Sequence, residues 1–320
     1  MKMAGIASAT LLAGIALYFV GLRDRPNAPA SASSALHGAP AGKDKKSRAY
    51  YRSQDLPPVE APFHATISAL VERADQGDGD AACRLAMEYR KCYFVQQELM
   101  RLDDLSIAQG VDRAVQTISM LPESSPFYTG MEHCEGVRPA GPGRVAELLR
   151  RSALSGNPAA MRGYALGAAF STDTMLDDAD ELRTYKSLGP QIAQSAIEAG
   201  DGTVLLSLAA AYQPDNHLGA RPFLAQAVSI DVTEAMTLFQ VARSELSNQG
   251  RTDGPIWDFV NRQLANLEAR ASAEQRVESD RRAAALRGRV VRPIRLPSDN
   301  KVAFVSRATA EHFQTADCSR

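Results

Sequence analysis

The chain has 320 residues, of which 45% are hydrophobic and 23% are charged, which is typical of a globular protein with a core of its own. The formal net charge of −1 excludes a global field that would attract nucleic acid, so we expect no nucleic-acid partner. Alanine, leucine, glutamate, glutamine and arginine dominate the middle of the chain, and β-branched runs are scarce. This composition predicts an all-α fold.

Residues 1–22 are predicted to form a membrane-inserted helix. The run Ala4–Gly21 carries no charge, and as a helix it would span about 27 Å, close to the ~30 Å hydrocarbon core of a bilayer. A small-x-small site, Ala30-Ser31-Ala32, lies well past this run and beyond three charged residues. That distance favours an uncleaved signal anchor over a cleaved signal peptide, which stays the alternative.

Residues 23–60 are predicted to be a flexible tether. They are rich in alanine, proline, serine and glycine and contain few residues that could form a core. A helical domain is expected to follow over residues 61–267.

A helical hairpin recurs within that domain. In Ala146–Phe170, Gly156 ends one helix, Asn157 caps the next, and Pro158 suits its first turn. Segments aligned on Gly77, Gly156 and Gly200 share small or apolar residues at the same offsets, and an interrupted unit is expected between residues 93 and 140. The signature positions are Gly77, Ala81, Leu85, Tyr89, Gly156, Ala160, Tyr164, Gly200, Leu208 and Tyr212.

Hairpins this short cannot bury their own apolar faces, so the pattern predicts an α-solenoid of stacked helical hairpins. An irregular bundle of alanine-rich helices is the alternative.

The pattern A-x-x-G-x-x-x-A-x-x-x-[LY]-[AG]-x-x-[YA] resembles a Sel-one-like repeat, a branch of the tetratricopeptide superfamily. The residues that carry it are Ala74, Gly77, Ala81, Leu85 and Tyr89, and then Ala153, Gly156, Ala160, Tyr164 and Gly167. The chain departs from the family in having Ala86, Ala165 and Ala209 where glycine is usual, and Val204 where alanine is usual.

This resemblance implies a scaffold for protein–protein interaction in a bacterial envelope. Together with the predicted anchor, it implies a single-pass protein of the cytoplasmic membrane with its helical domain in the periplasm. Cleavage of the signal would instead release that domain into the periplasm.

The four cysteines are Cys83, Cys92, Cys134 and Cys318. Their spacing does not suit zinc, whereas disulfides are favoured in an exported chain. On one straight helix Cys83 and Cys92 would lie about 13 Å apart, too far to bond. Cys92, near the expected end of that helix, is better placed to meet Cys134, so we predict a Cys92–Cys134 disulfide and a buried thiol at Cys83. Pairing of Cys83 with Cys134, or of a remaining cysteine with Cys318, stays open.

No catalytic, phosphate-binding or metal-binding motif occurs in the local sequence, so no cofactor and no metal are expected. The acidic stretch Leu176–Glu181 could hold calcium, but it is also typical of a helix start. The glycine-rich stretch Gly141–Arg144 is typical of a loop that leads into a helix.

Residues 268–320 are predicted to be a charged helix and an extended tail. Ile256–Arg289 forms a single helical pattern whose first half is apolar, to cap the repeats, and whose second half is charged, to project into solvent. Six arginines follow one another without an intervening acid and could contact anionic headgroups or an acidic partner. They are Arg281, Arg282, Arg287, Arg289, Arg292 and Arg295.

The function expected from these features is a membrane-tethered envelope scaffold that binds a protein or peptide partner and contacts the membrane through its N-terminal helix. A cell-envelope hydrolase with a site assembled from distant residues, and a purely structural envelope protein, are the alternatives.

Overall fold

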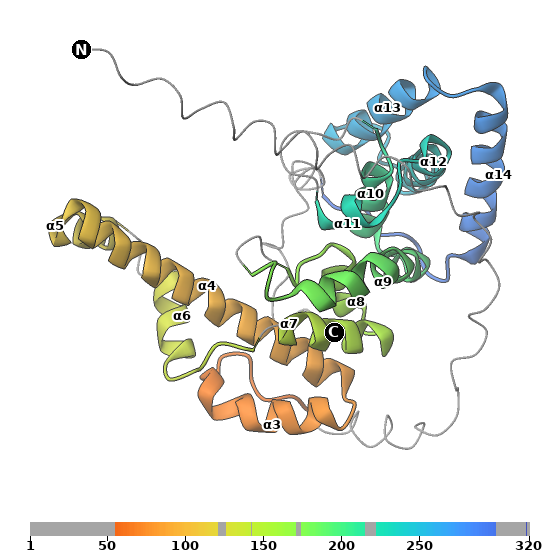
Figure 1. Cartoon of the computed structure of the whole chain (residues 1–320). Helices are drawn as coiled ribbons and strands as arrows, with labels where there is room; N and C mark the ends of the chain where they lie inside the picture. Colours follow the sequence, from red (N-terminus) through yellow and green to blue (C-terminus); the bar gives the residue numbers. More distant parts are fainter. Residues whose placement is uncertain are drawn as a thin grey trace, which may run out of the picture. The chain divides into compact units, whose positions relative to one another are not determined.

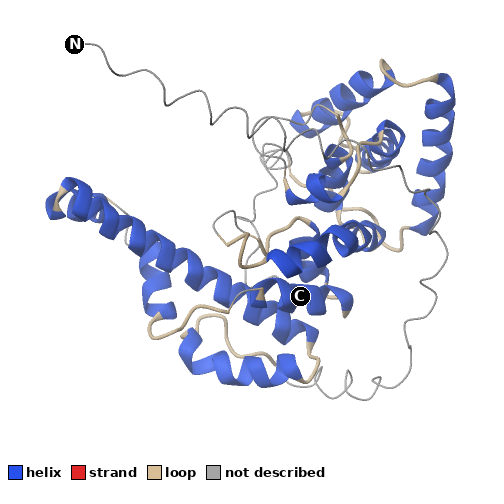
Figure 2. Ribbon diagram, in the orientation of Figure 1, coloured by secondary structure: helices blue, strands red, loops and turns tan. Residues whose placement is uncertain are grey.

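The structure is a computed structural model that describes residues 55–120, 126–141, 143–170, 174–214, 222–298 and residue 318. These residues form helices joined by loops, and the only strand-like feature among them is an isolated bridge (Figure 2). The all-α prediction is confirmed for this part of the chain. The predicted anchor, and the predicted tether up to residue 54, lie outside the described residues. Within the described residues, no helix has the length and apolar character needed to span a bilayer.

Successive helices pack side by side along the chain. In Figure 1 they are α3 (Phe63–Asp75), α4 (Gly79–Gln109), α5 (Val111–Ser119), α6 (Pro126–Cys134), α7 (Arg144–Leu154), α8 (Pro158–Ala165), α9 (Ala179–Glu198), α10 (Gly202–Ala211), α11 (Phe223–Ala227), α12 (Val232–Asn248), α13 (Pro255–Glu268) and α14 (Ala273–Arg289). Helix α3 packs on α4, α4 on α7, α7 on α8, α8 on α9, α9 on α10, α10 on α12, and α12 on both α13 and α14.

The three aligned glycines form the same turn in three hairpins, α3–α4, α7–α8 and α9–α10. Gly77, Gly156 and Gly200 have φ values of 92°, 92° and 96°, a left-handed region that other residues rarely adopt. The residue after each glycine caps the second helix of its hairpin, because its side-chain oxygen accepts hydrogen bonds from the first-turn amides. These caps are Asp78, Asn157 and Asp201.

The residues four positions after each glycine lie in the core. Ala81, Ala160 and Val204 are completely buried. The small side chains let the helices approach closely, so the repeat positions are sites of helix packing.

The interrupted unit predicted between residues 93 and 140 takes another form. Helix α4 does not end after a short hairpin but continues over 31 residues to Gln109, where Gly110 terminates it at φ 91°. Helices α5 and α6 then pack back against α4. The first and second hairpins are therefore separated by an extension of α4.

The prediction of a single helix over Ile256–Arg289 is wrong. The chain breaks into α13 and α14 at Ser272, which forms a capping box with Gln275. Helix α14 does not project into solvent, because it packs on α12 and buries Ser279, Ala283 and Leu286. The charged residues of α14 therefore occupy only its outer face.

Residues 291–297, here called the C-terminal strap, lie between the Gly200 turn of the third hairpin and the turn that joins α12 to α13. The strap pairs with the third hairpin, because the Arg295 amide donates to the Gly200 carbonyl at 2.9 Å. The Gly202 amide donates to the Arg295 carbonyl at 3.2 Å, and a Cβ at Gly202 would overlap that carbonyl. On the other side, the Gln249 side chain donates to the Ile294 carbonyl at 2.7 Å. The strap thus joins the third hairpin to the α12–α13 turn.

Replacing Ala160 with leucine is expected to lower the free energy of unfolding by about 1–3 kcal/mol, because the added atoms overpack a completely buried contact. Thermal or denaturant unfolding followed by circular dichroism measures the change. The matched control is Ala284→Leu on the exposed face of α14, which should be close to neutral. Equal losses in the two variants would contradict close packing at Ala160.

Candidate functional site

The four cysteines form two disulfides. Cys92 at the middle of α4 bonds to Cys134 at the end of α6, with an S–S distance of 2.08 Å, which is the pairing that the sequence favours. Cys83 is not a free buried thiol, as expected from sequence, but bonds to Cys318 with an S–S distance of 2.09 Å. Among the described residues no cysteine is free.

Cys318 brings the end of the chain to the first two hairpins. Its sulfur is bonded within α4, and its carbonyl accepts a hydrogen bond from the Asn157 side chain at 3.0 Å. The same Asn157 amide group donates to Asp80 at 2.7 Å. An asparagine at this cap can donate as well as accept, which the aspartates at the other two caps cannot do.

A buried ionic cluster lies beside the Cys92–Cys134 disulfide. Glu88 accepts from the Arg84 guanidinium at 2.7 Å, and its other oxygen lies 2.6 Å from His133 Nε2. All three side chains are almost completely buried. Burial raises the pKa of Glu88, but the bonds to His133 and Arg84 outweigh it and hold that pKa below its ordinary value.

This cluster is a packing element. The Arg84 guanidinium also donates to the Pro58 carbonyl at 3.2 Å, and the His133 ring stacks on Phe63 with centroids 6.4 Å apart. None of the three residues lines the open groove between α12, α13 and α14 that is described below. Because the charged groups are paired with one another and enclosed, they connect α4 and α6 and fix the segment before α3.

The acidic stretch Leu176–Glu181 begins α9 and is engaged in protein contacts. Asp178 accepts from the Gly143 amide at 2.7 Å, and Glu181 pairs with Arg150 at 3.1 Å. No group of three potential metal-binding side chains occurs in the part of the chain that the structure describes. Gly143 is the N-cap of α7, as expected of a loop that leads into a helix.

The repeat signature residues do not converge on a site. Leu85, Tyr164 and Leu208 lie in the core, while Tyr89 and Tyr212 are half-buried. Burial raises the pKa of Tyr212 to about 12, with Glu234 and Asp231 acting in the same direction. These residues build the scaffold.

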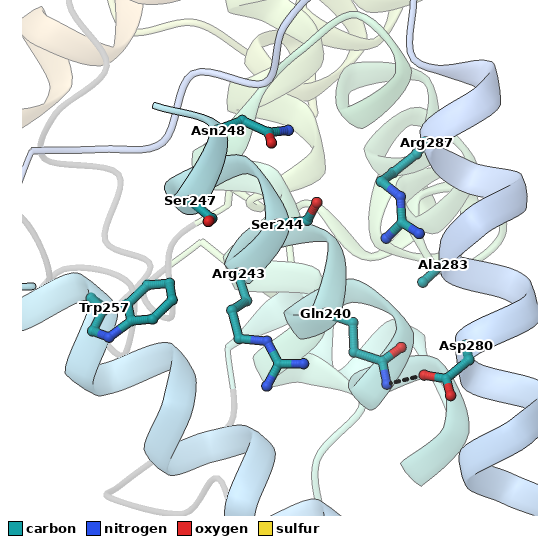
Figure 3. A pocket seen from close by; sticks show the side chains of 9 residues that line it. All are labelled: Gln240, Arg243, Ser244, Ser247, Asn248, Trp257, Asp280, Ala283 and Arg287. Atoms are coloured by element: carbon teal, nitrogen blue, oxygen red, sulfur yellow. Dashed lines mark hydrogen bonds between the residues drawn. The ribbon is translucent and has the colours of Figure 1, made fainter. Parts of the chain in front are cut away.

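An open groove of about 470 Å³ lies between α12, α13 and α14. Figure 3 shows α12 at its centre, Trp257 of α13 on one side and Arg287 of α14 on the other. The α12 residues that line it follow the i, i+3, i+4 spacing of one helix face, opposite the apolar face that packs on α10. They are Gln240, Arg243, Ser244, Ser247 and Asn248.

Comparisons of the chain with protein-family models, curated proteins and solved structures find no match. The groove is therefore interpreted from its own residues. Its volume falls in the range of ligand pockets, and its lining combines hydroxyl, amide, carboxylate, guanidinium and indole groups. Such a lining can bind a polar, extended ligand but contains no nucleophile paired with a base.

No sequence signal marks this groove. A polar stripe on a helix is typical of a solvent-exposed face, and Trp257 and Arg287 lie on other helices. The sequence contains a partial signal for the buried cluster, because Arg84 and Glu88 are four residues apart and can pair on one helix. His133 follows Glu88 by 45 residues, so its place in the cluster could not be predicted.

Proposed function

We propose that this chain is a membrane-tethered helical-repeat protein of the bacterial cell envelope that binds a protein or peptide partner. The observation that carries the proposal is the open polar groove between α12, α13 and α14, which Arg243, Arg287 and Trp257 line together with polar side chains of α12. An exposed groove on a helical array suits a partner larger than an enclosed small molecule.

The repeat geometry supports a Sel-one-like solenoid. Three hairpins share the left-handed glycine, the capping residue and the buried position four residues after the glycine. The hairpins also contact one another in chain order, α4 with α7 and α8 with α9, which is the arrangement expected of stacked repeats. Both features add to the resemblance of the sequence pattern.

The proposed location rests on two features. Ala4–Gly21 is an uncharged run long enough to cross a bilayer as a helix, and the two disulfides suit an oxidising compartment such as the periplasm.

A reporter that is active only outside the cytoplasm, fused after residue 320, is expected to be active in the membrane fraction. The reason is that an uncleaved anchor would hold the helical domain on the periplasmic side. Cell fractionation and N-terminal sequencing of the mature protein provide the measurement. An inactive reporter, or a mature chain that begins near residue 33, would contradict the uncleaved anchor.

Binding by the groove is tested by photocrosslinking in cells. A photoreactive residue at Ser247, which is exposed in the groove, is expected to form an adduct with one envelope protein. The same residue at Ser187, exposed on α9 outside the groove, is the control. Absence of an adduct at Ser247, or equal adducts at both positions, would overturn the proposed function.

A further inference from the structure

Exposed apolar side chains gather on the extension of α4 and on α5. Thirteen large apolar side chains of the described residues are exposed, and seven of them lie in this part of the chain. They are Phe94, Leu99, Met100, Ile107, Val111, Val115 and Met120. A concentration of exposed apolar side chains marks a surface that contacts another molecule, so the extension is a candidate interaction surface.

The hairpin packing does not require this extension. Helices α8 and α10, which hold the same place in their hairpins as α4, end after 8 and 10 residues, whereas α4 has 31. Helices α5 and α6 pack on the added part (Figure 1), and the Cys92–Cys134 disulfide bonds α6 to it. Beyond Cys92 the helix continues for about 26 Å. An insertion into one repeat of a helical array is a common place for a binding surface.

One face of the extension combines apolar and acidic side chains. Four exposed residues of α4 follow the i, i+3, i+4, i+7 spacing, namely Met100, Asp103, Asp104 and Ile107. Each aspartate is three or four residues from both apolar residues, so helix geometry alone makes them neighbours. The buried Leu102 lies on the opposite side of the helix, while Met100 and Ile107 are 53% and 78% exposed. These four residues are called the acidic–apolar face below.

The negative charge of this face is not offset on the extension. Between Phe94 and Gln109 the chain has three acidic residues and one arginine, and that arginine, Arg101, donates to Glu98 at 2.9 Å. Within the described residues, the Asp103 and Asp104 side chains form no ion pair or hydrogen bond and cap no helix. The two carboxylates therefore make no contact there that would explain them as parts of the scaffold.

The combination selects among the possible occupants of the face. Two carboxylates beside an apolar surface repel anionic lipid headgroups. They would also repel each other if two copies of the chain packed through the same face, because such a contact pairs a surface with itself. A helix with lysine or arginine beside an apolar stripe suits both parts. Its apolar side chains can cover Met100 and Ile107 while its cations pair with Asp103 and Asp104.

We infer that the acidic–apolar face of α4 binds an amphipathic helix of a partner protein whose apolar stripe is flanked by lysine or arginine. This inference goes beyond the proposed function, because it assigns a second surface that shares no residue with the groove between α12, α13 and α14. A missing crosslink at Ser247 contradicts the groove as a binding site, whereas failed binding of the helix described next contradicts only the α4 face.

A designed helix tests the chemistry of the partner. The probe is a fluorescein-labelled, amidated peptide of three heptads, with leucine at the first and fourth positions, lysine at the fifth and seventh, and alanine elsewhere. Its match carries glutamate in place of lysine. The full-length protein is used with its disulfides intact in phosphatidylcholine nanodiscs, and empty discs give the background. We expect saturable binding of the lysine peptide by fluorescence anisotropy and at least about tenfold weaker binding of the glutamate peptide. Equal binding of the two, or no binding of the lysine peptide above background, would overturn the inference.

Variants locate the binding on α4. Ile107→Ser and the double variant Asp103→Asn/Asp104→Asn are each expected to weaken binding of the lysine peptide about tenfold. The matched control, Asp177→Asn/Asp180→Asn, removes two exposed carboxylates near the start of α9 and should leave binding unchanged. Thermal unfolding of each variant checks that the exposed substitutions leave the fold intact. Retained affinity in the α4 variants, or an equal loss in the control, contradicts binding by this face.

A photoreactive residue at Ala108 separates the possible occupants. Ala108 is exposed and four residues from Asp104, so the probe lies beside the face. With the lysine peptide present, we expect an adduct between peptide and protein. Without peptide, an adduct of two protein chains would assign the face to self-association. An adduct with lipid in discs that contain phosphatidylglycerol would assign it to the membrane surface. Either of these two results would overturn the inference.

Discussion

Replacing Cys318 with serine is expected to lower the free energy of unfolding by about 5 kcal/mol in the chain-entropy description of a cross-link. The bond between Cys83 and Cys318 spans 235 residues of sequence, so its loss frees a very long loop in the unfolded chain. The loss also releases the Cys318 carbonyl from Asn157. Denaturant unfolding of the oxidised protein measures the change.

The matched comparison is the double variant Cys92→Ser/Cys134→Ser. Its bond spans only 42 residues, so the same description gives a smaller loss of about 4 kcal/mol. Limited proteolysis separates the two, because loss of the shorter bridge should expose the α4–α6 region first. Equal stability of Cys318→Ser and the wild-type protein would show that the long bridge does not hold the end of the chain.

The Asn157→Asp variant tests the same contact without touching a cysteine. Aspartate keeps the oxygen that caps α8 but cannot donate to Cys318 or to Asp80. Its new charge also faces the Asp80 carboxylate. We expect a measurable loss of stability at neutral pH that shrinks as the pH is lowered and the carboxylates become protonated.

Replacing Glu88 with glutamine is expected to lower the free energy of unfolding by about 3–5 kcal/mol at neutral pH. The substitution keeps the size of the side chain but leaves the buried Arg84 guanidinium without its counter-charge and changes the contact with His133. The loss should be larger than that of Glu278→Gln, whose carboxylate is more exposed and binds Arg281 and Arg282 on the surface of α14.

The effect of Glu88→Gln should depend on pH. The folded state holds the pKa of Glu88 below its ordinary value of 4.5, so the carboxylate contributes stability above that pH and the contribution is lost as the pH falls through the folded pKa. The gap in stability between wild type and variant should therefore be full near pH 7 and shrink below about pH 4.5. A gap that stays constant down to acid unfolding would contradict the ionic role.

A third variant keeps this test informative if Glu88→Gln fails to fold. Replacing the whole cluster, as Arg84→Met/Glu88→Leu/His133→Phe, leaves no unpaired charge in the core. We expect this triple variant to be more stable than Glu88→Gln, because the desolvation of all three polar groups is removed together. A lower stability would show that the cluster contributes specific structure beyond its charge balance.

Local signals account for the features that were predicted correctly. A glycine followed by aspartate or asparagine carries its own conformational preference, so the turns at Gly77, Gly156 and Gly200 could be located without any tertiary information. Helix geometry excluded only a Cys83–Cys92 bond, since two cysteines nine residues apart on one helix cannot meet. The choice of Cys92 for Cys134 is correct, but it assumed that Cys92 lies near a helix end, whereas α4 continues to Gln109. The break at Ser272 was missed because the helical pattern continues on both sides of it.

By itself the sequence determined the helical class and the positions of the three turns at Gly77, Gly156 and Gly200, because each depends on residues within one or two helical turns of one another. Only the tertiary structure decided that Cys83 meets Cys318, that His133 completes a buried cluster with Glu88, and that Arg287 faces the polar stripe of α12. These contacts join segments from about 40 to more than 200 residues apart, and nothing in the pattern of either segment specifies its partner. Which helices come together depends on how the apolar faces of all the hairpins are buried at once, which no single segment encodes.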